Sequence, residues 1–316
     1  MSNEIVVRTN FKTVEELEQR NCGITKTIFQ KSVLEGVGSA FMFNSSDKTA
    51  ELINDRNIKR IGDIASCVTG FYSGNDKVYL HPVNYEIRNS KRYICANSED
   101  IRTTPLSQKE KECGISGTAC LVPIVKGGNI EYVKPNHWFM DWSIQAITEY
   151  RQSKKCRFQN TDFYFKNGIG IPMIRSSKLT GALVDGRLFD QSIVGVFPKD
   201  ETWVYYLLGF FNSSVCTELV NAINPSTNNS ANYIKKIPFV TPCDDVRFKV
   251  EVLVENIVTT LKSGKSDIEA ERKELDEIFT NLYFKGIGAD NRETSKAKAS
   301  TRQLDLFGCS DNIQTM

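Results

Sequence analysis

The segment that decides the fold runs from residue 166 to residue 238. It opens with KNGIGIPMIRSSKLTGALVDGRLFDQSIVGVFP (residues 166–198) and continues with ETWVYYLLGFFNSSVCTELVNAINPSTNNSANYIKKIPF (residues 201–239). In the first part, short apolar runs alternate with glycines, a pattern typical of short strands joined by tight turns, at Gly168, Gly170, Gly181, Gly186 and Gly195. The second part predicts a buried helix, a polar loop, and a short strand that ends at Pro238.

Within this segment, side chains that donate hydrogen bonds gather beside Pro172. They are Arg175, Ser176, Ser177 and Lys178. Such donors suit phosphate oxygens. No constellation of acid, base and nucleophile accompanies them, so the segment predicts binding and not catalysis.

The order of these blocks resembles the C-terminal target-recognition region of TaqI-like and type IIG DNA adenine-N6 methyltransferases, which occur in restriction-modification and related phage-defence systems. Two further blocks resemble this family in the same order. IKRIGDIASCVTGFYSGNDKVYL (residues 58–80) resembles the entry to the recognition domain, and VENIVTTLKSGKSDIEAERKELDEIFTNLYF (residues 254–284) resembles its closing helical hairpin. The resemblance covers roughly residues 58 to 285 and implies recognition of double-stranded DNA.

The catalytic half of that family has no counterpart here. Its members need a glycine-containing cofactor loop and an (N/D)PP(Y/F) run that binds the flipped adenine. Asn224-Pro225 is followed by serine, and Gly36 and Gly38 precede a predicted strand where a cofactor loop needs a helix. We therefore expect no catalytic residue and no cofactor in this chain. The resemblance implies S-adenosylmethionine on a separate methyltransferase chain or domain, and whether the chain is itself an enzyme stays open.

Composition sets further limits. The chain has 316 residues, of which 40% are hydrophobic and 25% charged, as expected of a soluble globular protein. The net charge of +2 means that a nucleic-acid surface must be a local patch. Nine cysteines without a CxxC pair, and only two histidines, indicate reduced thiols in a cytoplasmic protein without a metal site. No apolar run approaches the roughly 20 residues that span a membrane.

The predicted fold class is α+β: a β-rich target-recognition domain with a buried helix, followed by an antiparallel helical hairpin. We divide the chain into a connector (1–57), the recognition domain (58–245), the hairpin (246–285) and a disordered tail (286–316). The connector has a capping box at Thr13 and Glu16, a strand at residues 39–44 and a helix at residues 48–56. Apolar stripes predict the hairpin, with a second capping box at Ser266 and Glu269.

Inside the recognition domain, several segments allow two interpretations. The loop at residues 73–77 is either an ordinary exposed turn or a contact with DNA, and so is the Asn-rich loop near Asn228. The basic end of a predicted helix at residues 143–156 is favourable at a helix C-terminus and is also a candidate contact. Residues 83–102 predict strand, turn and strand, residues 117–125 a buried strand, and Trp138, Phe139 and Trp142 core positions.

We therefore interpret the chain as a DNA-recognition module that partners double-stranded DNA and a methyltransferase chain, with no membrane. The candidate DNA-binding residues are Ser73, Gly74, Asn75, Lys77, Lys154, Lys155, Arg157, Arg175, Ser176, Ser177, Lys178, Asn228, Asn229, Lys235 and Lys236. Two alternatives stay open: a protein-interaction or inactive remnant of a fused enzyme, and a type I restriction specificity subunit.

Overall fold

The computed structural model describes residues 3–9, 11–19, 23–30 and 46–290. At the N-terminus, β1 (Glu4–Thr9) pairs antiparallel with β2 (Ile24–Phe29). The helix α1 (Val14–Gln19) lies between the two strands in the sequence. The predicted cap of α1 is present, because the Glu16 amide donates to Thr13 Oγ1 at 3.2 Å. The predicted strand at residues 39–44, the glycines Gly36 and Gly38, and the tail from residue 291 lie outside the described residues.

A four-stranded antiparallel sheet forms the middle of the molecule. Its strands, in spatial order, are β4 (Ala65–Thr69), β11 (Ile193–Pro198), β8 (Ile169–Pro172) and β9 (Ala182–Leu183). Close packing explains two of its glycines. A Cβ atom on Gly168 would lie 2.5 Å from the Phe197 ring, and one on Gly195 would lie 2.8 Å from the Phe189 ring. Of Gly168, Gly170, Gly181, Gly186 and Gly195, only Gly186 has a positive φ, so aromatic packing explains Gly168 and Gly195 better than a turn does.

The helices that cover this sheet begin with α8 (Val204–Phe211) and α9 (Ser214–Ile223). One continuous helix was expected here, and that expectation is wrong. Asn212 leaves the helix and exchanges two 2.9 Å hydrogen bonds with the backbone of Gly181. Ser213 then caps α9 by accepting from the Cys216 amide at 3.1 Å. The break is therefore fixed by a contact with a distant turn.

The hairpin consists of α11 (Asp244–Lys262) and α12 (Glu269–Lys285), and the predicted apolar stripes face the core, with Leu253, Leu261 and Ile278 half-buried and the other stripe residues buried. They pack on α8, where Gly209 admits α11: a Cβ there would lie 2.9 Å from Val254 Cγ2. Phe210 stacks on Tyr283 with ring centroids 5.1 Å apart. The predicted Ser266 cap is wrong, because Ile268 occupies the N-cap position without a side-chain cap. The hairpin thus belongs to the core of its own chain.

Short elements complete this part of the protein, which we call the main lobe. They are α3 (Asp47–Asn54), β3 (Lys59–Arg60), α4 (Ile61–Ile64), the 3₁₀ helix η5 (Glu201–Trp203), α10 (Ala231–Ile234) and β12 (Pro238–Phe239). The helix α3 confirms a prediction. The expected strand before Pro238 is wrong, because α10 occupies that segment and β12 begins at the proline, where it pairs with β3.

A second four-stranded sheet and the helices around it form what we call the distal lobe. The strands of this sheet, in spatial order, are β10 (Leu188–Phe189), β6 (Leu121–Val125), β7 (Trp138–Asp141) and β5 (Leu80–Pro82). Around it lie α5 (Asp76–Tyr79), α6 (Gln108–Cys113), α7 (Ile144–Gln152) and η4 (Thr161–Phe163). The strand β6 and the helix α7 confirm their predictions. Phe139 and Trp142 are buried as predicted, whereas Trp138 is half-buried.

One segment of the distal lobe differs from the predicted secondary structure. Residues 83–102 form turns and two 3₁₀ helices, η2 (Ser90–Arg92) and η3 (Ser98–Asp100), so the predicted strands there are wrong.

Phe71 follows β4 and links the two sheets. Its amide donates to Phe189 O at 2.8 Å, and its ring centroid lies 4.9 Å from that of Tyr150. The preceding glycine, Gly70, is required, because a Cβ there would lie 2.2 Å from Phe189 O.

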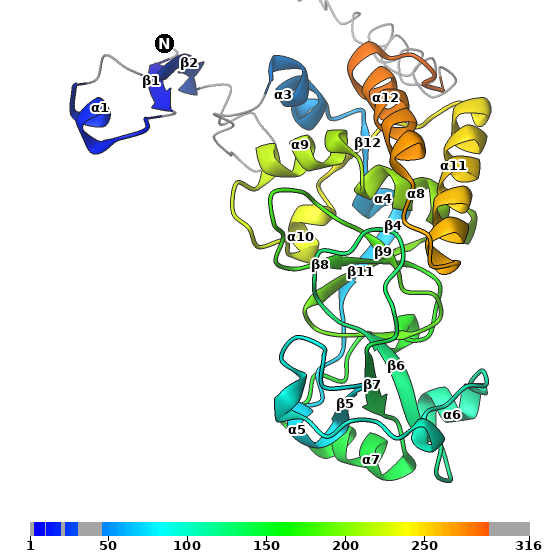
Figure 1. The fold of residues 1–316 in the computed structure, drawn as a ribbon. Coiled ribbons are helices and arrows are strands. Elements are labelled where there is room, and N and C mark those ends of the chain that lie inside the picture. Colours follow the sequence, from blue (N-terminus) through cyan, green and yellow to red (C-terminus); the bar gives the residue numbers. More distant parts are fainter. Residues whose placement is uncertain (1–2, 10, 20–22, 31–45, 291–316) are drawn as a thin grey trace, which may run out of the picture.

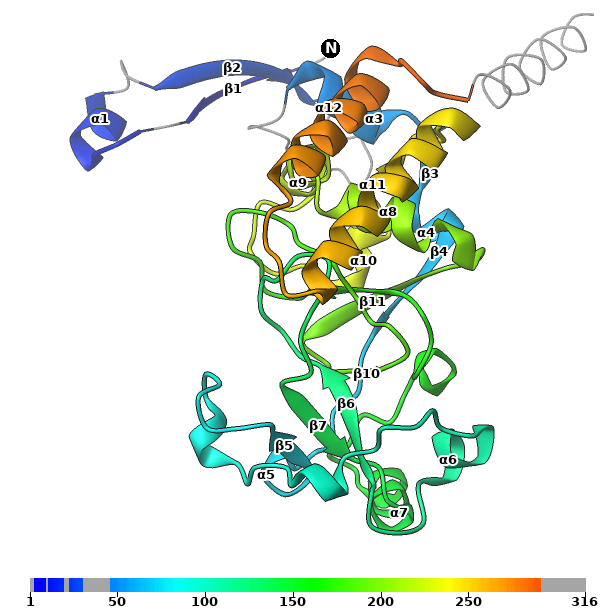
Figure 2. The same cartoon turned by 45° about the vertical axis from the view of Figure 1, so that its right-hand side comes forward.

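The fold is α+β, with helices packed on open, mainly antiparallel sheets. Figures 1 and 2 show the same order along the molecule: α8, α9, α11 and α12 gather at one end, the sheet containing β11 and β8 follows, and the distal lobe forms the other end. Each lobe has its own cluster of buried apolar residues.

Candidate nucleic-acid interface

A group of exposed cations lies in the distal lobe, where the residues 73–77 meet the chain that leaves α7. Arg157 and Tyr72 form an antiparallel bridge, and the Arg157 amide donates to Tyr72 O at 2.9 Å. Gly74 has φ +82°, and a Cβ on it would lie 2.9 Å from Cys156 N. These contacts place the segment with Lys155 and Arg157 against the turn at Gly74, which Asn75 and Lys77 follow, although the two segments are far apart in sequence.

Exposure separates the candidates in this group. Asn75, Lys77 and the three cations after α7 are exposed, and none of the cations forms an ion pair with the residues that the structure describes. Ser73 is buried, and its Oγ donates to Asp76 Oδ1 at 2.6 Å and accepts from the Asn75 amide at 3.1 Å. The expectation of a wholly exposed loop is therefore wrong at Ser73, which instead shapes the turn into α5.

Arg175 is likewise buried, with 6% of its surface exposed. Its Nη2 donates to Asn224 O at 2.7 Å and to Ser226 O at 2.8 Å. Its own amide donates to Thr227 O at 3.0 Å. Burial lowers the pKa of this guanidinium. Arg175 thus clamps the Asn-rich loop and presents no charge at the surface, which corrects the expectation of an exposed donor cluster.

The loop that Arg175 holds also contains two candidate asparagines, which differ in exposure. Asn229 is fully buried; its amide donates to Met173 O at 2.6 Å and its Nδ2 to Pro172 O at 3.3 Å. Asn228 is exposed and forms a β-bridge with Ile174. Only Asn228 of this pair is therefore placed to contact a ligand.

The remaining candidates are exposed in the main lobe. Ser176, Ser177 and Lys178 lie at the surface, and Lys178 lines a groove along α12 that also contains Arg272 and Asp276. Lys235 and Lys236 follow α10; the carbonyl of Lys235 accepts from the Gly62 amide at 3.0 Å, and both side chains are exposed. The structure thus groups the candidates in separate regions of the two lobes and not in one cluster.

Sequence reasoning missed three cations between β6 and β10. The half-buried Lys126 lies 2.9 Å from Asp190 Oδ2 and 3.6 Å from Asp76 Oδ2. Burial alone would lower its pKa, but Asp190 and Asp76 raise it. Lys134 is buried, donates to Lys126 O and Gly128 O at 2.8 Å, and has its pKa lowered to about 8 by burial and by Arg187. No local pattern signals these contacts.

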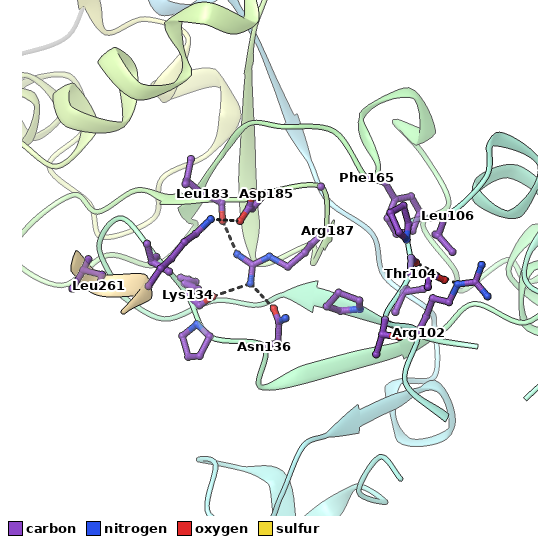
Figure 3. A pocket seen from close by; sticks show the side chains of 18 residues that line it. Arg102, Thr104, Leu106, Lys134, Asn136, Phe165, Leu183, Asp185, Arg187 and Leu261 are labelled. Atoms are coloured by element: carbon purple, nitrogen blue, oxygen red, sulfur yellow. Dashed lines mark hydrogen bonds and ion pairs between the residues drawn. The ribbon is translucent and has the colours of Figure 1, made fainter. Parts of the chain in front are cut away.

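The third missed cation, Arg187, borders a cavity of about 650 Å³ between the lobes (Figure 3). Its guanidinium donates to Lys134 O, Asn136 Oδ1 and Leu183 O, each at 2.8 Å. Across the cavity, Lys262 pairs with Asp185 at 2.8 Å. These polar groups are engaged with one another, and the cavity brings together no nucleophile with a base. The arrangement braces the junction of the lobes.

The part of the chain that the structure describes gives little support to a metal site, a disulfide or a membrane span. It contains no cluster of three or more histidine, cysteine or acidic residues that could hold a metal ion. The seven cysteines in the described ranges are all free thiols. None of the described helices is both long enough and apolar enough to cross a membrane.

Comparisons with known proteins point to a restriction-modification context. Over 177 residues, the chain is 26% identical to the type II methyltransferase M.MjaIV of Methanocaldococcus jannaschii, a match that covers 53% of this chain and 56% of the relative. The chain thus matches about half the length of that protein. No model of a known protein family matches the sequence.

Among solved structures, the type IIG restriction endonuclease BpuSI aligns with 83% of this chain and 36% of its own length, at 12% identity and a TM-score of 0.38. The sequence match supports the statement that the chain is related to restriction-modification proteins.

Proposed function

We propose that this chain is the DNA target-recognition module of a restriction-modification adenine-N6 methyltransferase, with methyl transfer supplied by a separate chain or domain. The observation that carries the proposal is the sequence similarity to a type II methyltransferase. The exposed cations around Gly74 support it, because lysine and arginine side chains without protein partners are available to phosphates.

In this proposal the distal lobe binds the DNA backbone through Lys77, Lys154, Lys155 and Arg157. Asn75, Ser176, Ser177, Lys178, Asn228, Lys235 and Lys236 are further exposed contacts. Ser73, Arg175 and Asn229 act indirectly, by fixing the loops that carry those residues. Phosphate contacts position the protein, whereas base contacts give specificity.

The helical hairpin is a weaker candidate for a partner interface than its sequence suggests. Leu275, Phe279 and Leu282 of α12 are all buried against the main lobe. Their apolar stripe is therefore already used inside the chain. This observation favours the DNA-recognition proposal over an interaction protein that docks through that stripe.

A binding selection tests the proposal. The full chain is incubated with a pool of duplexes of random sequence at two salt concentrations, and the bound DNA is sequenced. Enrichment of a short motif is the expected result, with weaker binding at the higher salt concentration because the release of counterions from the DNA is then less favourable. Absence of DNA binding at both salt concentrations would refute the proposal.

A pair of variants sharpens that experiment. Lys154→Gln with Lys155→Gln removes two exposed charges from the distal lobe and should weaken binding to all sequences. Lys265→Gln removes an exposed charge from the turn between α11 and α12 and serves as the control. Equal binding by both variants would exclude the cations after α7 from the interface.

A further inference from the structure

A loop at the open edge of the distal lobe carries an unusual surface. It spans residues 83–97, between the edge strand β5 and η3, and we call it the edge loop. Three apolar or aromatic side chains on it are exposed: Val83 by 40%, Tyr85 by 54% and Ile94 by 70%. Exposed apolar side chains that form a contiguous patch mark interaction sites in many proteins.

The edge loop is anchored at both ends. The Val83 amide donates to His137 O, and the Ala96 amide to Pro82 O, each at 2.9 Å. Near the second end, His81 Nδ1 lies 3.1 Å from Ile94 O. These bonds close the loop on β5 and on the segment before β7, so the exposure of Ile94 belongs to a defined conformation.

The middle of the edge loop is also shaped by its sequence. Asn89 adopts a left-handed conformation with φ 68°, which asparagine tolerates better than most residues. It turns the chain into η2, where Ser90 is buried and its amide donates to Ile87 O at 3.1 Å. The turn leaves the residues on either side of Ser90 at the surface.

Those residues are basic. Arg88, Lys91 and Arg92 are exposed, and none of them pairs with a carboxylate among the described residues. Residues 83–97 include a single acidic residue, Glu86, so the loop carries a formal charge of +2. Two acidic residues, Glu99 and Asp100, follow directly in η3, so the positive charge is confined to the loop itself.

The edge loop and the cation group around Gly74 share one support. Tyr93 packs edge-on against Trp138, with ring centroids 5.3 Å apart. Lys126 Nζ lies 5.8 Å from the Trp138 ring and 3.6 Å from Asp76 Oδ2, in the turn that leads into α5. Trp138 and Lys126 therefore connect the two loops through a chain of contacts within one lobe.

We propose that the edge loop is a segment with which this chain reads base edges in duplex DNA. Arg88, Lys91 and Arg92 bind phosphates on the groove walls, and Tyr85 and Ile94 face the groove. Apolar side chains distinguish thymine through its methyl group. This inference rests on the proposed function, and it assigns specificity to residues outside the cation group around Gly74.

The charge pattern favours DNA over a protein partner. The apolar core of a protein interface is typically depleted of charged residues. Here the same short loop carries exposed apolar side chains and three cations without an ion pair among the described residues, a combination that fits a polyanion with apolar groups in its grooves. Duplex DNA is such a ligand, because its backbone phosphates flank bases that carry methyl groups.

The test uses the full chain and the selection from random duplexes, with Tyr85→Ala and Ile94→Ala compared with the wild type. We expect at least one variant to lose its base preference at one or two positions of the motif. A third variant, with Arg88, Lys91 and Arg92 changed to glutamine, should bind all sequences more weakly and reduce the slope of log affinity against log salt by about 2–3.

Lys109→Gln is the matched control, because Lys109 is an exposed cation on α6, which Figures 1 and 2 both place away from α5. Thermal melting establishes that every variant is folded. If the wild type selects a motif and both Tyr85→Ala and Ile94→Ala select the same motif with unchanged preferences, the edge-loop inference is wrong and the proposed function stands. If the wild type binds no DNA, the proposed function itself fails.

Discussion

Replacing Arg175 by methionine should destabilise the protein without changing the number of phosphates that it contacts. The guanidinium holds the Asn-rich loop through Asn224 O at 2.7 Å and Ser226 O at 2.8 Å. Methionine retains the apolar length of the side chain but donates no hydrogen bond. The carbonyl groups of the buried Asn224 and of Ser226 would thus lose this partner.

The magnitude follows from opposing contributions. Hydrogen bonds to a charged group contribute about 1.5–3 kcal/mol each, so two of them set an upper limit of about 6 kcal/mol. Removing the guanidinium also removes the desolvation penalty of a buried charge, which is several kcal/mol. We therefore expect a net loss of about 2–3 kcal/mol, or a decrease in Tm of about 5–10 °C for a folded region of this size.

Two measurements test the assignment of Arg175 as a buried clamp. Thermal unfolding followed by circular dichroism gives Tm, and DNA affinity across a range of salt concentrations gives the charge contribution. Lys178→Met is the control, because Lys178 is exposed only three positions away. It should leave Tm nearly unchanged and, if it contacts phosphate, reduce the salt slope by about 1. An Arg175→Met variant with wild-type Tm and a reduced salt slope would refute the assignment of Arg175 as a buried clamp.

Three further predictions follow from the distal lobe. The double variant Lys154→Gln with Lys155→Gln should reduce the salt slope of DNA binding by about 2, measured by fluorescence anisotropy; an unchanged slope would contradict a phosphate role for both lysines. Gly74→Ala should lower Tm and weaken DNA binding together, because its φ of +82° and a Cβ only 2.9 Å from Cys156 N force the loop to move; an unaltered Tm would mean that the loop moves freely. For Lys134, the folded-state pKa of about 8 lies below the ordinary 10.5, so its charged form opposes folding most strongly below pH 8. Stability should therefore rise between pH 8 and 10.5 by up to about 1.4 kcal/mol per pH unit relative to Lys134→Met, measured by urea unfolding, and parallel pH profiles would exclude this titration.

Regular elements were the most predictable part of the fold. The apolar stripe on α12 required only the spacing of Leu275, Phe279 and Leu282, and the strand β6 required only a short apolar run. Their periodicity is local, and burial follows from it directly. Prediction failed where a distant segment intervenes. Nothing near Asn212 indicates that its side chain bonds the Gly181 backbone and divides one apolar helix into two.

The candidate interface shows the same division. Sequence correctly singled out exposed cations after α7, because a charged run at a helix end is almost always at the surface. It misjudged Ser73, which lies buried beside Asp76, and it overlooked the edge loop because residues 83–102 were expected to form strands. Their alternation of apolar and polar residues suits a strand, but the hydrogen bonds to His137 O and Pro82 O hold them as a loop.

The sequence alone therefore determined the fold class, the hairpin and the resemblance to a DNA-recognition region, since each depends on patterns within a few tens of residues. The tertiary structure decided which cations face solvent. In the sequence, Arg175 and Arg187 lie beside polar residues, much as surface arginines do. In the structure, each donates a hydrogen bond to a carbonyl group more than 45 positions away. Because those carbonyls converge only when the chain folds, the structure alone separates a buried clamp from the exposed cations that we propose as DNA contacts.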